Sequence, residues 1–225
     1  MEIILNDKPL IKVYNSDCME ILKNTPDKFY DLAVVDPPYG INQSGNKNKT
    51  RGNLAIAKDY KSFAGDDKES PCLEYFQELF RVSNKQIIWG ANHFISKIPF
   101  DSSSWLVWDK NNSDNYFADC ELAWTSFKKV VRKFKYTWHG MLQNDMKNKE
   151  IRIHPTQKPR ALYHWIYKNY AKAGYKILDT YLGSGSSAIE AYYSKLDFTG
   201  IELDSGYFNS FLNRYKKETI QLSFL

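Results

Sequence analysis

The stretch Leu32-Ala33-Val34-Val35-Asp36-Pro37-Pro38-Tyr39 decides both the fold and the chemistry expected of this chain. Its four apolar residues predict a buried parallel strand. An acid at the carboxyl end of such a strand lies where open α/β sheets bind their ligands. The two prolines fix φ and lack backbone donors, so their carbonyl groups remain as acceptors beside a carboxylate and an aromatic ring. This set suits the exocyclic amino group of a planar base; the alternative interpretation is a strand-ending turn with a packed tyrosine.

Composition narrows the class of protein. With 225 residues, of which 43% are hydrophobic, one domain with a sizeable core is expected. The 31 basic and 26 acidic residues give a net charge of +5, a mild bias towards anionic partners. The three cysteines are far apart, and the chain has no CxxC or HExxH motif, so we expect neither a disulfide framework nor a metal site. The sequence shows no signal-peptide pattern and no long apolar span, so we expect a cytoplasmic protein without a membrane segment.

Strand and helix patterns alternate along the chain, which predicts an α/β sheet with helices on both faces. Acids end or closely follow four of the predicted strands, namely Asp17, Asp36, Asp179 and Glu202. The carboxyl ends of parallel strands meet at one edge of a sheet, so these acids predict a shared crevice.

Two helix starts are also expected from the sequence. Ser16 or Asp17 is suited to cap a helix that continues through residue 22. Ser70 and Pro71 predict the N-cap and first residue of another helix, whose apolar face would include Leu73, Phe76, Leu79 and Phe80.

A second motif, Asp179-Thr180-Tyr181-Leu182-Gly183-Ser184-Gly185, predicts a strand, an acid and a glycine-rich turn that opens a helix. The glycine spacing also fits a dinucleotide fingerprint. An acid before the glycines would repel a pyrophosphate but attract an ammonium group, and too few elements follow for a dinucleotide half-fold. A nucleoside that carries an amino acid fits better, with Asp179 and the turn at its amino-acid end and Glu202 at its ribose.

The motifs together resemble the beta class of amino-methylating DNA methyltransferases. The matching segments are Asp36-Pro37-Pro38-Tyr39, His154-Pro155-Thr156-Gln157-Lys158-Pro159, residues 179–187 and Gly200-Ile201-Glu202. In that class the catalytic motif comes first and the cofactor motif last, a circular permutation of the usual order. The resemblance implies an α/β fold with a mostly parallel, seven-stranded, doubly wound sheet and one antiparallel strand. Residues 177–179 would form its central first strand, 198–201 the second, 12–14 the third and 32–35 the fourth.

The resemblance also implies the cofactor S-adenosylmethionine, with S-adenosylhomocysteine as product, and the residues that bind it. These are Asp17, Cys18, Asp36, His154, Thr156, Lys158, Asp179, Tyr181, Gly183, Ser184, Gly185, Ser186, Ser187, Glu202 and Leu203. Asp17 falls where the family contacts the adenine amino group of the cofactor. Thr180 and Tyr181 replace the family's usual Pro and Phe, and Ser187 stands where Thr is common. The aromatic residue is kept, so cofactor binding is expected.

The expected catalytic residues are Asp36, Pro37, Pro38 and Tyr39. The target base would leave the DNA helix, stack on Tyr39 and donate its amino hydrogens to the Asp36 carboxylate and the Pro37 carbonyl. An Asp-initial motif favours adenine N6, with cytosine N4 as the alternative. RNA or protein amide methylation is less favoured, because those enzymes usually keep the unpermuted order and an Asn-initial motif. A nucleotide-binding module without catalysis is the alternative from another class.

We expect residues 1–225 to form a single methyltransferase domain that binds double-stranded DNA without a separate recognition domain. Two segments would then read the DNA: a basic loop at residues 41–61 and an insert at residues 111–149. Their candidate DNA-binding residues are Lys47, Lys49, Arg51, Lys58, Lys133 and Lys135. The alternatives are a solvated loop without a role and a half-buried edge strand. A homodimer and a cognate restriction enzyme remain open as further partners.

Overall fold

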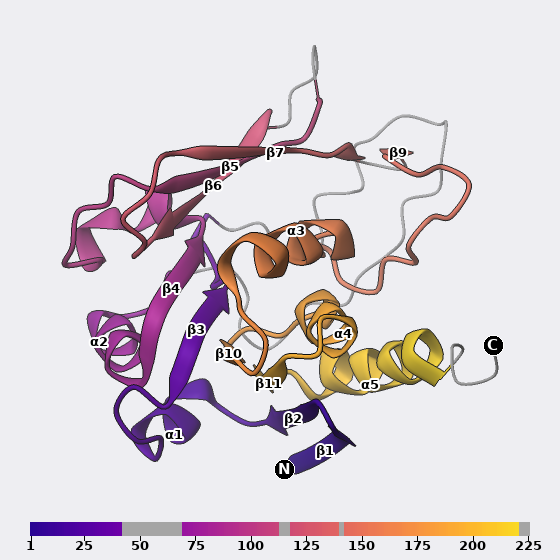
Figure 1. Cartoon of the computed structure of the whole chain (residues 1–225), viewed down its shortest axis with the longest axis horizontal. Coiled ribbons are helices and arrows are strands. Elements are labelled where there is room, and N and C mark those ends of the chain that lie inside the picture. Colours follow the sequence, from indigo (N-terminus) through magenta and orange to yellow (C-terminus); the bar gives the residue numbers. More distant parts are fainter. Residues whose placement is uncertain (42–68, 113–117, 140–141, 221–225) are drawn as a thin grey trace.

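A computed structural model of the chain describes residues 1–41, 69–112, 118–139 and 142–220. In these ranges the chain forms a nine-stranded sheet of order β1-β2-β11-β10-β3-β4-β6-β5-β7 (Figure 1). The strands are β1 Glu2–Asp7, β2 Leu10–Asn15, β3 Tyr30–Val35, β4 Ser83–Trp89, β5 Trp105–Asp109, β6 Cys120–Thr125, β7 Arg132–Lys135, β10 Lys176–Asp179 and β11 Asp197–Glu202. Two short strands, β8 Trp138–His139 and β9 Leu142–Gln143, pair separately.

The five central strands β2, β11, β10, β3 and β4 all run parallel. The predicted central strand at residues 177–179 is confirmed: it lies in β10, and the predicted second, third and fourth strands lie in β11, β2 and β3 around it. The prediction of seven strands with one antiparallel strand is wrong in number, because β1 and β7 extend the two edges and both β1 and β6 are antiparallel to their neighbours. An edge strand buries only one side: in β1, Ile3 and Leu5 pack on the core while the intervening Ile4 is exposed.

Helices cover both faces of the sheet, as Figure 1 shows. They are α1 Cys18–Lys23, α2 Leu73–Val82, α3 Arg160–Tyr170, α4 Ser186–Tyr193 and α5 Ser205–Ile220, with the 3-10 turns η2 Ala91–His93 and η3 Ile95–Lys97. Alternate residues of one strand point to opposite faces. In β3, Leu32 and Val34 accordingly join the core under α3, α4 and α5, whereas Ala33 and Val35 join the core under α1 and α2.

The two expected helix starts have different outcomes. Asp17 caps α1 as predicted, and its carboxylate accepts the Met19 N–H at 2.8 Å. The predicted start of α2 is wrong: Cys72 is the N-cap and makes no side-chain cap bond. The Ser70 hydroxyl instead accepts a hydrogen bond from Lys97 Nζ at 2.8 Å, a tertiary contact that replaces the cap.

The buried face of α2 also differs from the prediction. Phe76 and Leu79 are buried as expected, but Leu73 is 52% exposed. Tyr75 and Val82 complete the buried face in its place.

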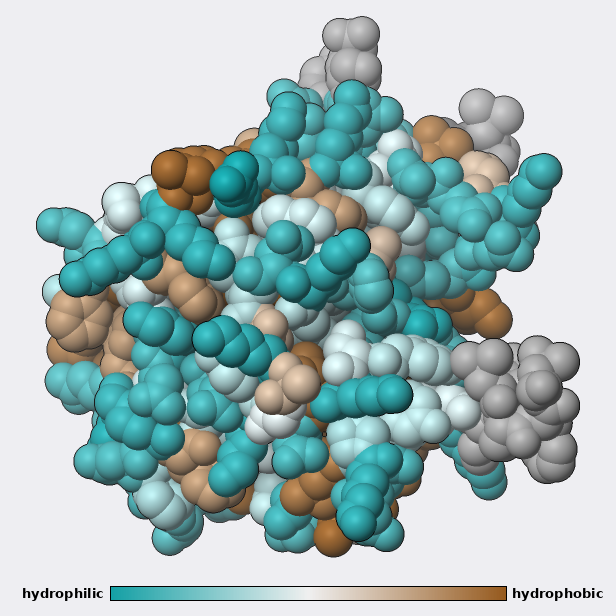
Figure 2. All heavy atoms as spheres, in the orientation of Figure 1, coloured by the Kyte–Doolittle hydropathy of each residue, from teal (hydrophilic) through white to brown (hydrophobic). Residues whose placement is uncertain are grey.

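Hydrophilic side chains dominate the face of the molecule in Figure 2, and apolar ones are scattered over it. Among the described residues, no helix has the length and apolar character needed to span a membrane.

Candidate active site at the strand ends

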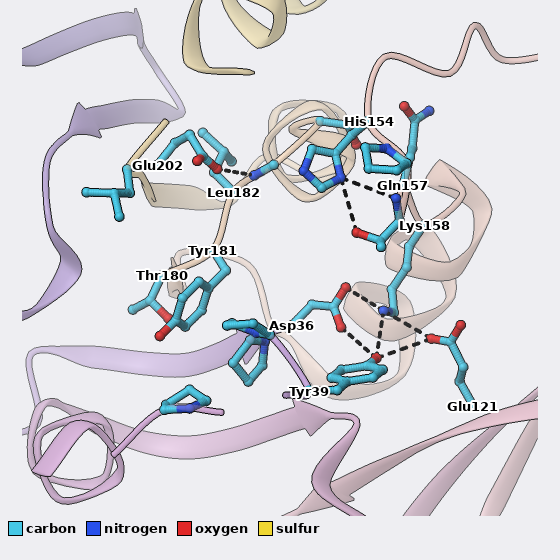
Figure 3. Close-up of a pocket in the computed structure, with 18 of the residues that line it drawn as sticks. Asp36, Tyr39, Glu121, His154, Gln157, Lys158, Thr180, Tyr181, Leu182 and Glu202 are labelled. Carbon is cyan, nitrogen blue, oxygen red and sulfur yellow. Dashed lines mark hydrogen bonds and ion pairs between the residues drawn. The ribbon is translucent and has the colours of Figure 1, made fainter. Parts of the chain in front are cut away.

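A cavity of about 550 Å³ lies at the carboxyl ends of the central strands (Figure 3). It brings together most of the residues predicted to bind the cofactor or the base. Those that line it are Asp17, Cys18, Asp36, Pro37, Pro38, Tyr39, His154, Thr156, Lys158, Tyr181, Gly183, Ser184, Glu202 and Leu203. Four predicted cofactor residues, Asp179, Gly185, Ser186 and Ser187, lie behind the wall rather than on it.

Asp36 directly follows β3, and both of its carboxylate oxygens are engaged. Lys158 Nζ forms an ion pair with Oδ2, and the Tyr39 hydroxyl donates to Oδ1 at 2.9 Å. The Lys158 side chain is only 4% exposed. Lys158 was predicted to serve the cofactor, but the structure places its ammonium group against the proposed catalytic acid.

Glu121 of β6 is a site residue that sequence reasoning missed. Its Oε2 lies 3.1 Å from Lys158 Nζ, and its Oε1 forms an ion pair with Lys110 Nζ. In the sequence, Glu121 looks like one residue of an ordinary strand. The signal lies in strand direction: β6 runs antiparallel to β4, so its first residues lie at the edge where the parallel strands end.

Burial and neighbouring charges shift the pKa values of Asp36, Glu121 and Lys158. Burial raises the pKa of Asp36, and the charge of Glu121 adds to this effect, while Lys158 opposes it. Burial alone would raise the pKa of Glu121, but Lys158 and Lys110 lower it to about 2. Burial alone would lower the pKa of Lys158, but Asp36 and Glu121 raise it. Asp36 is therefore the carboxylate that accepts a proton more readily.

The Tyr39 ring is held in place by two neighbours. It stacks on His93 with ring centroids 5.0 Å apart and an interplanar angle of 16°. Gly90 has φ +67°, and a Cβ at this position would lie 2.0 Å from Tyr39 Cε1. The absence of a side chain at Gly90 thus creates the space that the ring occupies.

The glycine-rich turn forms the opposite wall of the cavity. Gly183 and Gly185 both have positive φ, +52° and +72°. The Gly183 N–H donates to Glu202 Oε2 at 2.8 Å, which ties the turn to the end of β11. Behind the wall, Asp179 accepts the Tyr181 N–H at 3.1 Å and the Ser187 hydroxyl at 2.6 Å. Burial raises the pKa of Asp179 to about 7.

Three more predicted residues complete the cofactor side. Glu202 accepts the Asp204 N–H at 2.9 Å through Oε1, and its carboxylate oxygens retain further lone pairs for ligand hydroxyls. The centroids of the His154 and Tyr207 rings lie 4.2 Å apart. Burial lowers the pKa of His154 to about 4, so this imidazole is neutral near pH 7. The Thr156 hydroxyl lies 3.1 Å from His154 Nδ1.

Two of the predicted DNA-binding residues, Lys133 and Lys135, lie on β7, and their role in binding DNA stays a prediction. The rings of Phe134 and Tyr136 stack on each other, and Phe134 packs against Trp165 of α3 with centroids 5.4 Å apart. The aromatic side of β7 is therefore covered by α3, as the half-buried edge alternative predicts. Lys133 and Lys135 remain exposed on the other side.

The candidate DNA residues Lys47, Lys49, Arg51 and Lys58 lie outside the described residues, as does most of the basic loop at 41–61. The structure adds several residues to the cavity wall that the sequence did not indicate. These are Met19, Pro71, Cys72, Tyr75, Trp108, Lys110, Asn112, Glu121, Trp138, His139, Arg152, Tyr163 and Thr180. Many of them lie in connecting segments whose place at the strand ends depends on the fold.

Comparison with known proteins supports the resemblance to DNA methyltransferases that the sequence motifs indicate. Residues 108–213 match the N6_N4_Mtase family model, described as DNA methylase. This part of the chain is therefore similar to a DNA methylase domain. The chain is 24% identical to the Type II methyltransferase M.HinfI of Haemophilus influenzae, over 87% of this chain and 65% of that protein. It is 22% identical to the Type II methyltransferase M2.MboI of Moraxella bovis, over 95% of this chain and 90% of that protein. The chain thus spans about two thirds of M.HinfI and most of M2.MboI.

Solved structures share the fold of this chain. The M1.HpyAVI–SAM complex has a TM-score of 0.55 at 23% identity and covers 90% of this chain and 98% of that chain. The PvuII DNA methyltransferase, titled cytosine-N4-specific, has a TM-score of 0.58 at 13% identity and covers 92% and 89%. At these identities the likeness concerns the fold, and it confirms the predicted α/β methyltransferase architecture.

Proposed function

We propose that this protein transfers a methyl group from S-adenosylmethionine to the exocyclic N6 of an adenine in double-stranded DNA. One observation carries the proposal: the Asp36 motif and the glycine-rich turn open on a single cavity of about 550 Å³. A methyl donor and an acceptor amino group must meet in one enclosed place for in-line transfer. The similarity to a DNA methylase domain supports DNA as the substrate.

The cofactor side of the cavity fits a nucleoside that carries an amino acid. Glu202 offers a carboxylate for ribose hydroxyls, and the turn at Gly183 presents no side chain there. Asp17 and the Tyr181 ring line the wall near α1, where they would hold the adenine ring of the cofactor. When bound, S-adenosylmethionine supplies an electrophilic methyl group.

On the other side, the protein's own groups would orient the target base. The Asp36 carboxylate and the Pro37 carbonyl accept hydrogen bonds from its amino group, which directs the nitrogen lone pair towards the methyl group. As the nitrogen gains the methyl group it becomes positively charged, and the adjacent carboxylate stabilises that charge. The raised pKa of Asp36 suits it to take up the proton that the nitrogen then releases.

Cys18 on the cavity wall is poorly suited to a covalent mechanism. Among the cysteines that line the cavity, burial raises the pKa of Cys18 to about 12, so Cys18 remains a thiol. Direct attack by the amino nitrogen therefore fits the site better than attack by an enzyme nucleophile.

Methylation of duplex DNA by the purified protein tests the proposal. The DNA is incubated with S-adenosylmethionine, digested and analysed by mass spectrometry for N6-methyladenine and N4-methylcytosine. Asp36→Ala should lower the methylation rate by a factor of about 10³ or more, because the carboxylate proposed to contact the amino group is lost. Cofactor binding, measured by calorimetry, should persist. Asp101→Asn, an exposed change, is the control.

Two results would contradict this assignment. N4-methylcytosine as the product would support the second candidate, cytosine-N4 methylation, which the fold similarity to the PvuII enzyme keeps in view. Cofactor binding without transfer to any DNA would instead favour RNA, a protein amide or a non-catalytic module.

The proposal extends to location and partners. A DNA-modifying enzyme acts in the compartment that holds the DNA, for which we propose the cytoplasm. The similarity to Type II methyltransferases supports a cognate restriction enzyme, and resistance of the methylated DNA to such an enzyme would test it. A homodimer is tested by the mass of the protein in solution.

A further inference from the structure

Four charged side chains from four segments meet in the cavity (Figure 3). Asp36 follows β3, Lys110 follows β5, Glu121 lies on β6, and Lys158 precedes α3. Their contacts form one chain, in which Lys158 bridges the two carboxylates and Lys110 pairs with the outer one. Opposite charges therefore alternate through the group, and the formal charges of the four side chains cancel.

Glu121 has no place in the methyl-transfer mechanism above, yet it is held from two sides. Its two oxygens contact different ammonium groups, at 3.1 Å for Lys158. Its Oε2 also lies 3.4 Å from the Tyr39 hydroxyl. A buried carboxylate is costly unless it is paired, so its presence at the cavity wall needs a reason.

We propose that Glu121 is a positioning residue that shares Lys158 with Asp36 and thereby leaves the Asp36 carboxylate able to accept the target amino group. The inference rests on the proposed function of the site. Its basis is geometric: Lys158 Nζ lies between two carboxylates and 3.2 Å from the Tyr39 hydroxyl.

Glu121 weakens the electrostatic attraction between Lys158 and Asp36, because the Lys158 ammonium group is shared between the two carboxylates. An ammonium group has three donors, and here they are distributed over Asp36, Glu121 and Tyr39. Without the charge of Glu121, Lys158 would pair with Asp36 alone among the described carboxylates and bind it more strongly. The Asp36 oxygens would then be weaker acceptors and poorer bases.

Lys110 acts as the outer anchor of Glu121. Its ammonium group pairs with Oε1 and lies 5.1 Å from the centroid of the Trp108 ring. This contact offsets the cost of the second buried carboxylate without drawing Lys158 away from Asp36.

The charged and titratable groups around Asp36 affect the pKa that a titration of Asp36 would measure. Besides its own four members, the titratable groups that face this cluster from the packed elements are Tyr39 with the His93 ring stacked on it, His154, Tyr163 and Asp179. Removal of the Glu121 charge eliminates one contribution that raises the pKa of Asp36 and one that raises the pKa of Lys158. Both values should fall.

Glu121→Gln tests the inference because it removes the charge at almost constant shape. We expect kcat to fall about tenfold and the acid limb of its pH profile to move down by about one pH unit. The dissociation constant for S-adenosylmethionine, measured by calorimetry, should change less than about twofold, a tolerance set by ordinary scatter in such effects. Glu74→Gln, which removes an exposed carboxylate from α2, is the matched control and should leave both quantities unchanged.

A readout without turnover accompanies the kinetics. Carbon-13 NMR of labelled aspartate side chains follows the titration of Asp36, whose midpoint should move down in Glu121→Gln. Glu121→Asp restores the charge and should bring the midpoint and the pH profile most of the way back. If Glu121→Gln does not fold, Glu121→Leu, which removes the charge without leaving a polar group in the cavity wall, takes its place: an Asp36 midpoint unchanged in that variant would overturn the inference.

The outcomes separate the two claims. If the wild-type protein methylates no DNA, the proposed function fails, while the NMR midpoints still test the role of Glu121. If the wild-type protein is active and Glu121→Gln keeps its kcat, pH profile and Asp36 midpoint, the inference alone fails.

Discussion

Two buried acids end the neighbouring strands β3 and β10, and their surroundings differ. Asp36 faces the cavity and pairs with the ammonium group of Lys158. Asp179 lies behind the cavity wall and is held by a backbone N–H and by the Ser187 hydroxyl. No cation is recorded in contact with Asp179 among the described residues.

The difference assigns the two acids different tasks. Asp36 pairs with a lysine side chain and faces the cavity, as expected of a group that takes part in chemistry. The Asp179 bonds both end within the glycine-rich turn or the helix that follows it, so this acid shapes the backbone that a cofactor would contact. The sequence predicted direct cofactor contact for both acids, and of the two only Asp36 lines the cavity.

Lys158→Met should produce the largest change, on the Asp36 side. It leaves two buried carboxylates without the cation they share, and loss of one partner of a buried pair costs about 3–5 kcal/mol. The free energy of unfolding, from urea denaturation, should fall by that amount. Lys135→Met, on the exposed side of β7, should change it little. An unchanged stability in Lys158→Met would mean that the pair is not buried as described.

Asp179 should make stability depend on pH in the opposite way from a salt-bridged acid. Its pKa of about 7 exceeds the ordinary value, so between the two the folded protein binds more protons than the unfolded chain. Its contribution is therefore complete at low pH and is lost as pH rises through about 7, by up to about 4 kcal/mol. Asp179→Asn should flatten this decline in denaturation measured from pH 4 to 8; an equally steep decline would assign it to other groups.

Two substitutions at Tyr39 distinguish the effect of ring stacking from that of the hydroxyl hydrogen bond to Asp36. Tyr39→Ala should weaken binding of the target base by about 1–3 kcal/mol, because the aromatic platform is lost. Tyr39→Phe keeps the ring and removes only the hydroxyl bonded to Asp36, so most of the binding should remain. Fluorescence of 2-aminopurine at the target position measures both. Equal losses in the two variants would show that the hydroxyl, not the ring, matters.

The smallest effect is expected on the exposed side of β7. If Lys135 contacts a phosphate, Lys135→Ala should weaken binding to all DNA sequences alike and reduce the slope of log K against log salt by about 1. Phe134→Ala should leave that slope unchanged and lower the thermal midpoint instead, because Phe134 packs on Trp165. A reduced slope in Phe134→Ala would reverse the roles assigned to the two sides of β7.

The sequence predicts those parts of the site that lie in local motifs. Asp36, the glycine turn and the order of the four central strands could be placed because each follows a recognisable apolar strand or matches a family motif. Glu121 could not, because its position depends on the direction of β6. Serine is a common helix cap, but the Ser70 hydroxyl accepts a hydrogen bond from Lys97, which lies in a distant turn. These two cases share a cause: contacts between distant segments decide the outcome.

The sheet order has a consequence for synthesis. β10 and β11 are the last strands of the described chain, yet they lie between β2 and β3, which are among the first. Until residues 176–202 leave the ribosome, β2 and β3 each expose one unpaired parallel edge, and such edges favour pairing with other chains. The central part of this sheet can therefore close only after residues 176–202 have been synthesised, and the fold depends on long-range contacts that form slowly.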